Sequence, residues 1–162
     1  MFNVDNVLLA MVLNEVKDSG IKLKPVIYRG AIVPDYYVTF KGEIISTKRT
    51  TPKLLSATPG DKWNPYPKIG LVIDGKKKTV AIHRIVCETF HELPLPDILT
   101  QEEWAGISPE IRSKLLDYVS HADRYQVNHI DHDTDNYHPD NLEWVTVAEN
   151  QQKYQEHVKT RA

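Results

Sequence analysis

The stretch Tyr125-Gln126-Val127-Asn128-His129-Ile130 decides the C-terminal fold of this 162-residue chain. Because Tyr125, Val127 and His129 alternate with polar residues, a strand would place all three side chains on one face. Residues 131–140 follow with four Asp, one Asn, one Pro and two His. This turn-rich composition cannot supply a core element, so we expect the strand to end in a polar loop.

A second strand and a helix are predicted after the loop. Residues 141–145 favour the strand, and Thr146-Val147-Ala148-Glu149 matches the S/T-x-x-E capping box, so the helix should begin at Val147. Asn150 then lies in its first turns, 21 residues after His129. The resulting ββα unit is too small to bury much core by itself, and we interpret it as a functional site.

These residues resemble the HNH nucleases, and within them the phage and intron-borne homing endonucleases. The residues that match the family signature are Val127-Asn128-His129-Ile130-Asp131, Asp140-Asn141-Leu142-Glu143-Trp144-Val145-Thr146 and Glu149-Asn150. The match covers about the last fifth of the chain. It implies an α+β fold, in which a β-rich N-terminal half precedes a C-terminal ββα-metal (His-Me finger) unit. It also implies a homing-type, divalent-metal-dependent DNA endonuclease that hydrolyses phosphodiester bonds.

The resemblance also implies roles for the site residues. Phosphodiester hydrolysis needs a base for the attacking water and a cation that offsets charge on the phosphate. His129 would be the base, since an ordinary pKa near 6.5 leaves most of it neutral at physiological pH. Asn128 and Asn150 would hold Mg²⁺ (or Mn²⁺), for which amide oxygens are hard, neutral ligands. Asn141 would complete the catalytic set by bridging and stiffening the loop.

Some alternatives stay open at this stage. Related enzymes often carry Asp where this chain has Asn128, which favours a DNA-binding regulator that keeps the ββα fold without catalysis. An RNA-directed nuclease is a weaker alternative. Asp131 either belongs to the site or only starts the loop as an Asx turn. His132 and His138 lack the paired spacing of a structural zinc site, and the chain has a single Cys.

The charge distribution predicts double-stranded DNA as the partner, although the net charge is −2. Residues 41–90 hold ten Lys or Arg against four Asp or Glu, whereas 91–124 and 125–162 each hold three against seven. A basic segment is often only a solvated face, but here it precedes the motif, where it can grip a phosphate backbone. The candidate DNA-binding residues are Lys48, Arg49, Lys53, Lys76, Lys77, Lys78 and Arg84.

We divide the chain into four parts: 1–24, 25–93, 94–124 and 125–162. The first is an N-terminal helix, because apolar residues recur at helical spacing within 3–18. The second is a β-rich, basic, DNA-contacting region. The third is a helical insert, and the fourth is the HNH ββα motif.

The β-rich region shows two hairpin patterns and one helix. Residues 37–47 alternate around Lys41-Gly42, and 68–82 alternate around Asp74-Gly75, the strongest turn signal in the chain. His83 to Phe90 resembles the H-R-x-V-x-x-x-F segment of the homing endonucleases and fits a short helix.

The insert breaks this resemblance. Thr100 to Trp104 predicts a capped helical turn, and Ser108-Pro109 starts a second helix. Its predicted inner face consists of Ile111, Leu115, Leu116 and Val119. A lid or a partner surface is possible for this segment, and we favour a structural insertion.

A cytoplasmic location is expected. The single cysteine, Cys87, cannot form an internal disulfide, which fits a reducing compartment. The N-terminus lacks a signal-peptide pattern, and no 18-residue apolar run exists to span a membrane. Nothing in the sequence selects an oligomeric state.

Overall fold

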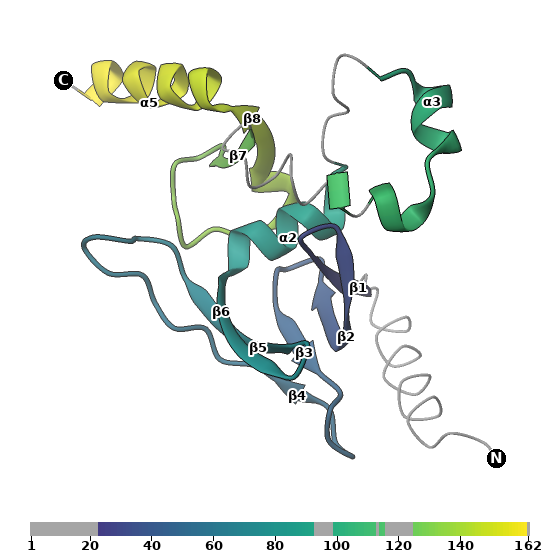
Figure 1. Ribbon diagram of the computed structural model, residues 1–162. Coiled ribbons are helices and arrows are strands. Elements are labelled where there is room, and N and C mark those ends of the chain that lie inside the picture. The colour runs from purple at the N-terminus through teal and green to yellow at the C-terminus, as the bar shows by residue number, and fades with distance from the viewer. Residues whose placement is uncertain (1–22, 93–98, 113, 116–124, 162) are drawn as a thin grey trace.

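The computed structural model describes residues 23–92, 99–112, 114–115 and 125–161, which Figure 1 shows as a coloured ribbon. The predicted N-terminal helix lies outside these residues, except that Leu23 and Lys24 begin a strand. The described elements are β1 (Leu23–Tyr28), β2 (Ala31–Thr39), β3 (Ile44–Ser46), β4 (Lys53–Leu54), β5 (Lys68–Ile73), β6 (Lys76–Ala81), α2 (Ile82–Phe90), α3 (Gln101–Gly106), β7 (Tyr125–His129), the 3-10 turn η1 (Pro139–Asn141), β8 (Leu142–Thr146) and α5 (Val147–Arg161).

The strands form three antiparallel groups. β1 to β4 make one sheet in sequence order, β5 pairs with β6, and β7 pairs with β8. Both predicted hairpins of the β-rich half are confirmed. The β5–β6 turn has positive φ at Asp74 (51°) and Gly75 (72°), as a type I′ turn requires. The fold is therefore the expected α+β arrangement of a β-rich half followed by a ββα unit.

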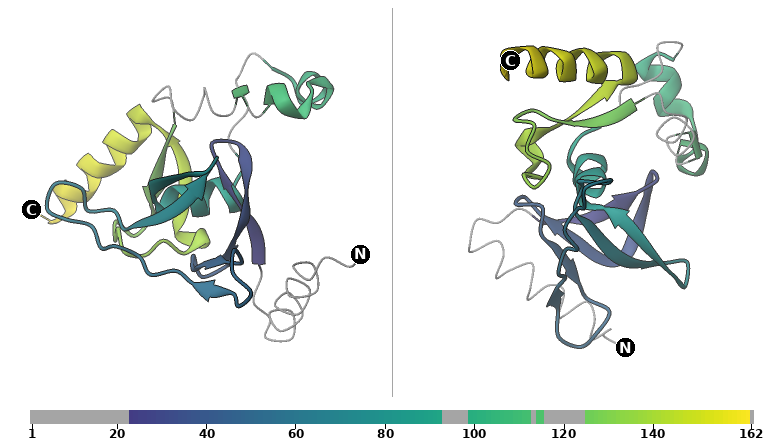
Figure 2. Two further views of the ribbon diagram at one scale, coloured as in Figure 1. Left: turned by 60° about the horizontal axis from the view of Figure 1, so that its bottom comes forward. Right: turned by 90° about the vertical axis from the view of Figure 1, so that its left-hand side faces the viewer.

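Helix α2 lies between the two halves of the molecule (Figures 1 and 2). Its predicted position is confirmed, because Ile82, Ile85 and Val86 are buried on one side. The same core cluster contains Leu71 from the β-rich half and Leu142 from the ββα unit. One shared core thus fixes the ββα unit against the strands that precede it.

Two further contacts join the halves. His91 Nε2 lies 2.7 Å from the Pro139 carbonyl oxygen, and the Trp144 indole N–H donates to the His91 carbonyl at 3.3 Å. At the β2–β3 turn, Gly42 has φ 81°, and a Cβ there would lie 2.6 Å from Cδ2 of Tyr137. Glycine is therefore required both by the turn and by the approach of the ββα loop.

The described part of the insert follows the predicted capping pattern. Thr100 and Glu103 form a reciprocal capping box at the start of α3. The Ser108 hydroxyl accepts a bond from the Ile111 N–H at 3.4 Å, and residues 109–112 are helical. Ile111 was expected on the inner face and is 53% exposed, so that assignment was wrong. Leu116 and Val119 lie outside the described residues.

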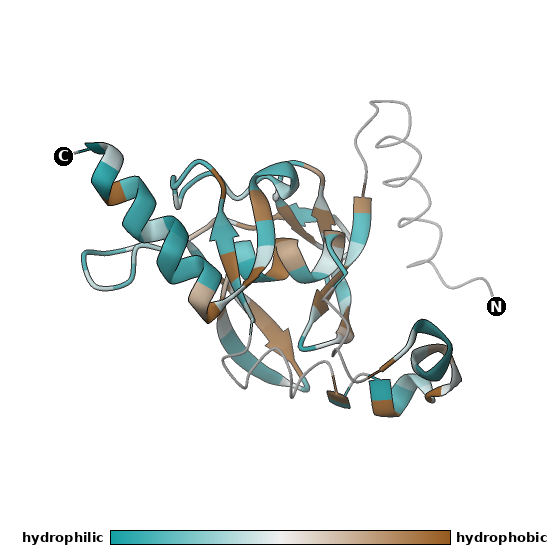
Figure 3. Ribbon diagram, turned by 90° about the horizontal axis from the view of Figure 1, so that it is seen from above, coloured by the Kyte–Doolittle hydropathy of each residue, from teal (hydrophilic) through white to brown (hydrophobic). Residues whose placement is uncertain are grey.

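Among the described residues, no helix has the length and apolar character needed to cross a bilayer. Figure 3 shows α5 as a mostly hydrophilic helix, and none of its residues is buried. The helix therefore depends on polar contacts at its ends and along one face rather than on a hydrophobic stripe.

Candidate active site

The predicted ββα unit is present at residues 125–161. β7 and β8 pair from Tyr125 opposite Thr146 to His129 opposite Leu142. Strand alternation puts His129 on the face opposite to Gln126 and Asn128. The Thr146–Glu149 capping box that starts α5 is also present, with the Glu149 carboxylate accepting from the Thr146 N–H at 2.8 Å.

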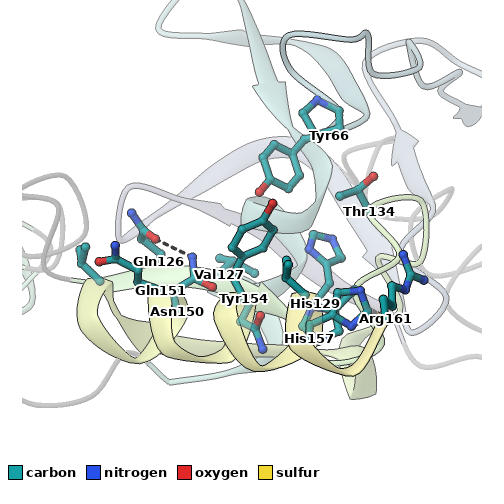
Figure 4. A pocket seen from close by; sticks show the side chains of 15 residues that line it. Tyr66, Gln126, Val127, His129, Thr134, Asn150, Gln151, Tyr154, His157 and Arg161 are labelled. Atoms are coloured by element: carbon teal, nitrogen blue, oxygen red, sulfur yellow. Dashed lines mark hydrogen bonds between the residues drawn. The ribbon is translucent and has the colours of Figure 1, made fainter.

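A cavity of about 850 Å³ lies between α5, β7 and the loop that precedes β5. Asn128, His129 and Asn150 all line it, together with Tyr66 from the β-rich half. Figure 4 shows this arrangement, with the side chains of α5 along one side and Tyr66 above them. The ββα unit alone thus does not enclose the site, because the preceding half supplies part of the wall.

His129 is held in an aromatic cluster. It is 5% exposed, and its ring stacks on Tyr66 with centroids 5.8 Å apart and planes 16° apart. The ring of His83 meets it edge to face at 5.2 Å. Nε2 of His129 is buried and has no hydrogen-bond partner among the described residues. Burial lowers the pKa of His129, although Asp131 and Asp133 act in the opposite direction.

Asn128 is oriented by a charged partner. Its Nδ2 donates to Oε1 of Glu143 at 2.8 Å, and the same carboxylate oxygen accepts from Nζ of Lys153 at 2.8 Å. The bond from Lys153 lowers the pKa of Glu143, so the carboxylate is ionised and only accepts. Asn128 must therefore present its N–H₂ to Glu143, which leaves its carbonyl oxygen as an unused acceptor.

Asn150 is held at the start of α5. Its Nδ2 donates to Oε1 of Gln126 at 2.6 Å, and this arrangement also keeps the Asn150 carbonyl oxygen as an acceptor. In Figure 4 the Gln126–Asn150 pair lies toward one end of the cavity and His129 toward the other, with Tyr154 between them in this view. The three predicted site residues share one cavity, but His129 and Asn150 are not in contact.

Asn141 stiffens the loop that joins the strands. Its Nδ2 donates to Oδ1 of Asp131 and to the carbonyl of Asn136, both at 2.8 Å, and its Oδ1 accepts from the Asp131 N–H at 3.1 Å. Asp131 also accepts from the Asp133 N–H at 2.9 Å as an Asx turn. These bonds, led by that from Asn136, lower the pKa of Asp131. Asn141 therefore acts on the loop and not on the cavity.

The other histidines of the motif do not form a zinc site. His132 stacks on His157 of α5 with ring centroids 3.8 Å apart, and His138 accepts from the Asp140 N–H at the start of η1. Among the described residues, no group of three or more His, Cys, Asp or Glu side chains is placed to hold a metal ion.

The donor set of the cavity nevertheless fits a weakly held Mg²⁺ or Mn²⁺. The unused carbonyl oxygens of Asn128 and Asn150 are hard ligands of the kind these ions take, and neither carries charge. Such a site needs further oxygen ligands from water or a bound anion. A phosphate group is an anion with this chemistry.

The predicted basic residues fall into two surface groups and one internal residue. Lys48, Arg49 and Lys53 are exposed around β4, and Lys76 and Lys77 are exposed on β6, where Lys78 is half-buried. Arg84 is different, because its guanidinium bonds to Glu88 at 3.2 Å and lies over the Trp144 ring at 5.9 Å. Its recorded contacts are therefore within the protein.

The sequence did not reveal the site roles of Tyr66, His83 and Gln126. Tyr66 and His83 lie 63 and 46 residues before His129, and only the fold brings their rings against it. Gln126 was visible as a polar residue of the strand, and its alternation with Val127 could have indicated that it faces the helix.

Comparison with known proteins supports the same site. Residues 120–152 match the family model described as HNH endonuclease. A solved structure described as "DNA binding and cleavage by the HNH homing endonuclease I-HmuI" matches with a TM-score of 0.52 and 25% identity. The match covers 84% of this chain and 59% of that chain, so this chain spans less than two thirds of that nuclease. No curated protein sequence matches the chain.

Proposed function

Because the C-terminal unit of this chain belongs to the HNH endonuclease family, we propose that the protein is a divalent-metal-dependent DNA endonuclease of the homing type. The single observation that carries the proposal is the shared cavity of Asn128, His129 and Asn150. It contains a neutral imidazole and two free carbonyl oxygens, which are a base and a pair of ligands for a hard cation.

His129 takes the proton from the attacking water. Burial keeps the pKa of this imidazole below its ordinary value, so it is neutral and basic near pH 7. Nε2 is the covered nitrogen, which assigns the proton to Nδ1. Asn141 contributes by fixing the loop that follows His129, through its bonds to Asp131.

Asn128 and Asn150 hold the metal ion through their carbonyl oxygens, with a DNA phosphate among the remaining ligands. When bound, Mg²⁺ or Mn²⁺ supplies charge that offsets the negative charge of the phosphate and of the leaving oxygen. Glu143 keeps the Asn128 amide in the orientation that this role needs.

Double-stranded DNA is gripped by the exposed cations of the β-rich half. The residues with this role are Lys48, Arg49, Lys53, Lys76, Lys77 and Lys78, whereas Arg84 orders α2 through Glu88. Cations on strands and turns contact phosphates without reading base sequence. Their contribution makes the affinity fall as salt concentration rises. We place this activity in the cytoplasm, where the free Cys87 stays reduced.

One observation favours a second function, that of a DNA-binding regulator without catalysis. Both proposed metal ligands are neutral amides, and Nε2 of His129 is buried. Such a protein would shift DNA in a gel without any divalent ion and would cut nothing.

Plasmid nicking or linearisation in Mg²⁺ and in Mn²⁺ tests the proposal. We expect the parent to cut, and His129→Ala and Asn150→Ala to lose at least about a hundredfold in rate, the usual contribution of a general base or an electrostatic group. Gln152→Ala is the matched control for Asn150, since Gln152 is an exposed amide on α5 that bonds only to Glu156. Cutting by His129→Ala and Asn150→Ala at the parent's rate would refute the site, and binding without cutting in either ion would favour the regulator.

A further inference from the structure

Trp63 is an exposed indole at the end of a polar loop. It is 89% exposed, the highest value among the large hydrophobic side chains that stand out from the described surface. We define residues 58–66 as the Trp63 loop, which runs between β4 and β5. Tryptophan carries a large apolar surface that is rarely left in water without a partner.

The backbone of the Trp63 loop is already ordered. Oδ1 of Asp61 accepts from the N–H groups of Trp63 at 2.8 Å and of Asn64 at 2.7 Å. The Asp61 N–H donates to the Asn64 carbonyl at 2.8 Å, and Thr58 pairs with Lys68 at the base of the loop. A side chain at Gly60 would clash with the backbone of Pro65. The indole is thus presented on a fixed turn, which lowers the entropy lost on binding.

The Trp63 loop also forms part of the proposed active site. Pro65 and Tyr66 line the cavity, and the Tyr66 ring stacks on His129. Three residues of chain span at most about 10 Å, so Trp63 lies within about three base pairs of any phosphate held beside Tyr66. Figures 1 and 2 show this loop projecting from the same side of the molecule as α5.

The charge beside the indole matches a polyanion. Nζ of Lys62 lies 5.5 Å from the centroid of the Trp63 ring, so a cation and an aromatic face are presented together. Proteins that hold nucleic acid combine such cations with aromatic side chains that pack on bases and sugars. An apolar protein partner would gain nothing from a cation at this position.

We propose that the Trp63 loop contacts duplex DNA next to the scissile phosphate, with the indole against the groove surface and Lys62 on a flanking phosphate. This inference rests on the proposed function, because it takes the phosphate of the active cavity as its reference point. It assigns to the loop a non-ionic share of DNA affinity, separate from the lysines of β4 and β6.

The test measures binding to a labelled duplex of mixed sequence by fluorescence anisotropy, in EDTA so that nothing is cut, over a series of salt concentrations. Trp63→Ala should weaken binding by about 5- to 100-fold, the range found for aromatic contacts to bases, without changing the slope of log K against log salt. Trp63→Phe should keep most of the affinity. Lys62→Gln should instead lower the slope by roughly one phosphate contact.

Ile32→Ala is the matched control, because Ile32 is a 64% exposed apolar residue of β2 that does not line the cavity. It should bind like the parent, and an unchanged Tm for Trp63→Ala should show that the fold is intact. Parent-like duplex binding by Trp63→Ala would overturn the inference while leaving the nuclease proposal in place. A parent that neither binds nor cuts duplex DNA would overturn both.

Discussion

At the scale of single residues, Asn128 is a neutral group held by a charged one. Its amide donates to Glu143, and the neighbouring Lys153 neutralises that carboxylate. Asn128→Asp would replace the donor with a second carboxylate. Without metal we expect a loss of about 1 to 3 kcal/mol, since the hydrogen bond is lost and two anions face each other. With Mn²⁺ the added charge should bind the ion more tightly and restore stability.

Differential scanning fluorimetry with and without Mn²⁺ measures this prediction. The Tm of Asn128→Asp should rise with the ion by clearly more than that of the parent. The double variant Asn128→Asp/Glu143→Gln removes the repulsion and should recover the metal-free Tm. Equal metal-induced shifts in parent and Asn128→Asp would contradict the assignment of Asn128 as a ligand.

His83 predicts a pH dependence of stability. Burial lowers its pKa to about 3, with the neighbouring His129 and Arg84 acting in the same direction. The unfolded chain takes up a proton below pH 6.5, and the folded chain does so only near pH 3. Stability is therefore full above pH 6.5 and falls as the pH drops below it, by about 1.4 kcal/mol per unit or about 2 kcal/mol at pH 5.

Urea unfolding at pH 7 and pH 5 checks this with His83→Leu. The variant should lose about 2 kcal/mol less than the parent between the two pH values, because it no longer titrates. The pKa of His129 is lowered as well, and its effect has the same sign in both proteins. An equal loss in the two proteins would mean that His83 is charged in the fold.

At the scale of elements, α5 depends on its first turn. It buries no residue, and its start is fixed by the Thr146–Glu149 capping box. Thr146→Ala should loosen that turn, where Asn150 lies, at a local cost of about 1 kcal/mol. Hydrogen exchange of residues 147–151 should become faster. Thr160→Ala at the other end of α5, where the hydroxyl bonds to the His157 carbonyl, should leave those amides unchanged.

The elements differ in how far the sequence predicts them. β5, β6, β7 and β8 follow from local alternation and turn chemistry, and α5 follows from its cap. β1 could not be predicted, because Val26 is its only buried residue and its register shifts between Pro25 and Ile27. Its partner β2 is interrupted by Pro34 and by Asp35 at φ 64°. Such strands form only because the sheet is completed elsewhere.

The candidate site shows the same division. The motif spacing predicts that Asn128, His129 and Asn150 share a cavity, since the ββα unit is local in sequence. The covering of His129 by Tyr66 and His83 depends on how the two halves pack, which no short pattern records. Ile111 was misplaced for a related reason, because helical spacing shows which residues share a face but not what that face contacts.

At the scale of the whole molecule, the shared core predicts that both halves unfold together. Ile85 is fully buried in α2, within a cluster that includes Leu71 and Leu142. Ile85→Ala removes atoms from the point where the halves meet and should cost about 2 to 5 kcal/mol, whereas Ile85→Val should cost about 0.5 to 1.5 kcal/mol. Hydrogen exchange at increasing urea can follow residues 68–81 and 125–146 separately. Both segments should lose protection at one midpoint that shifts equally in each variant; earlier loss in 125–146 alone would show that the ββα unit folds independently.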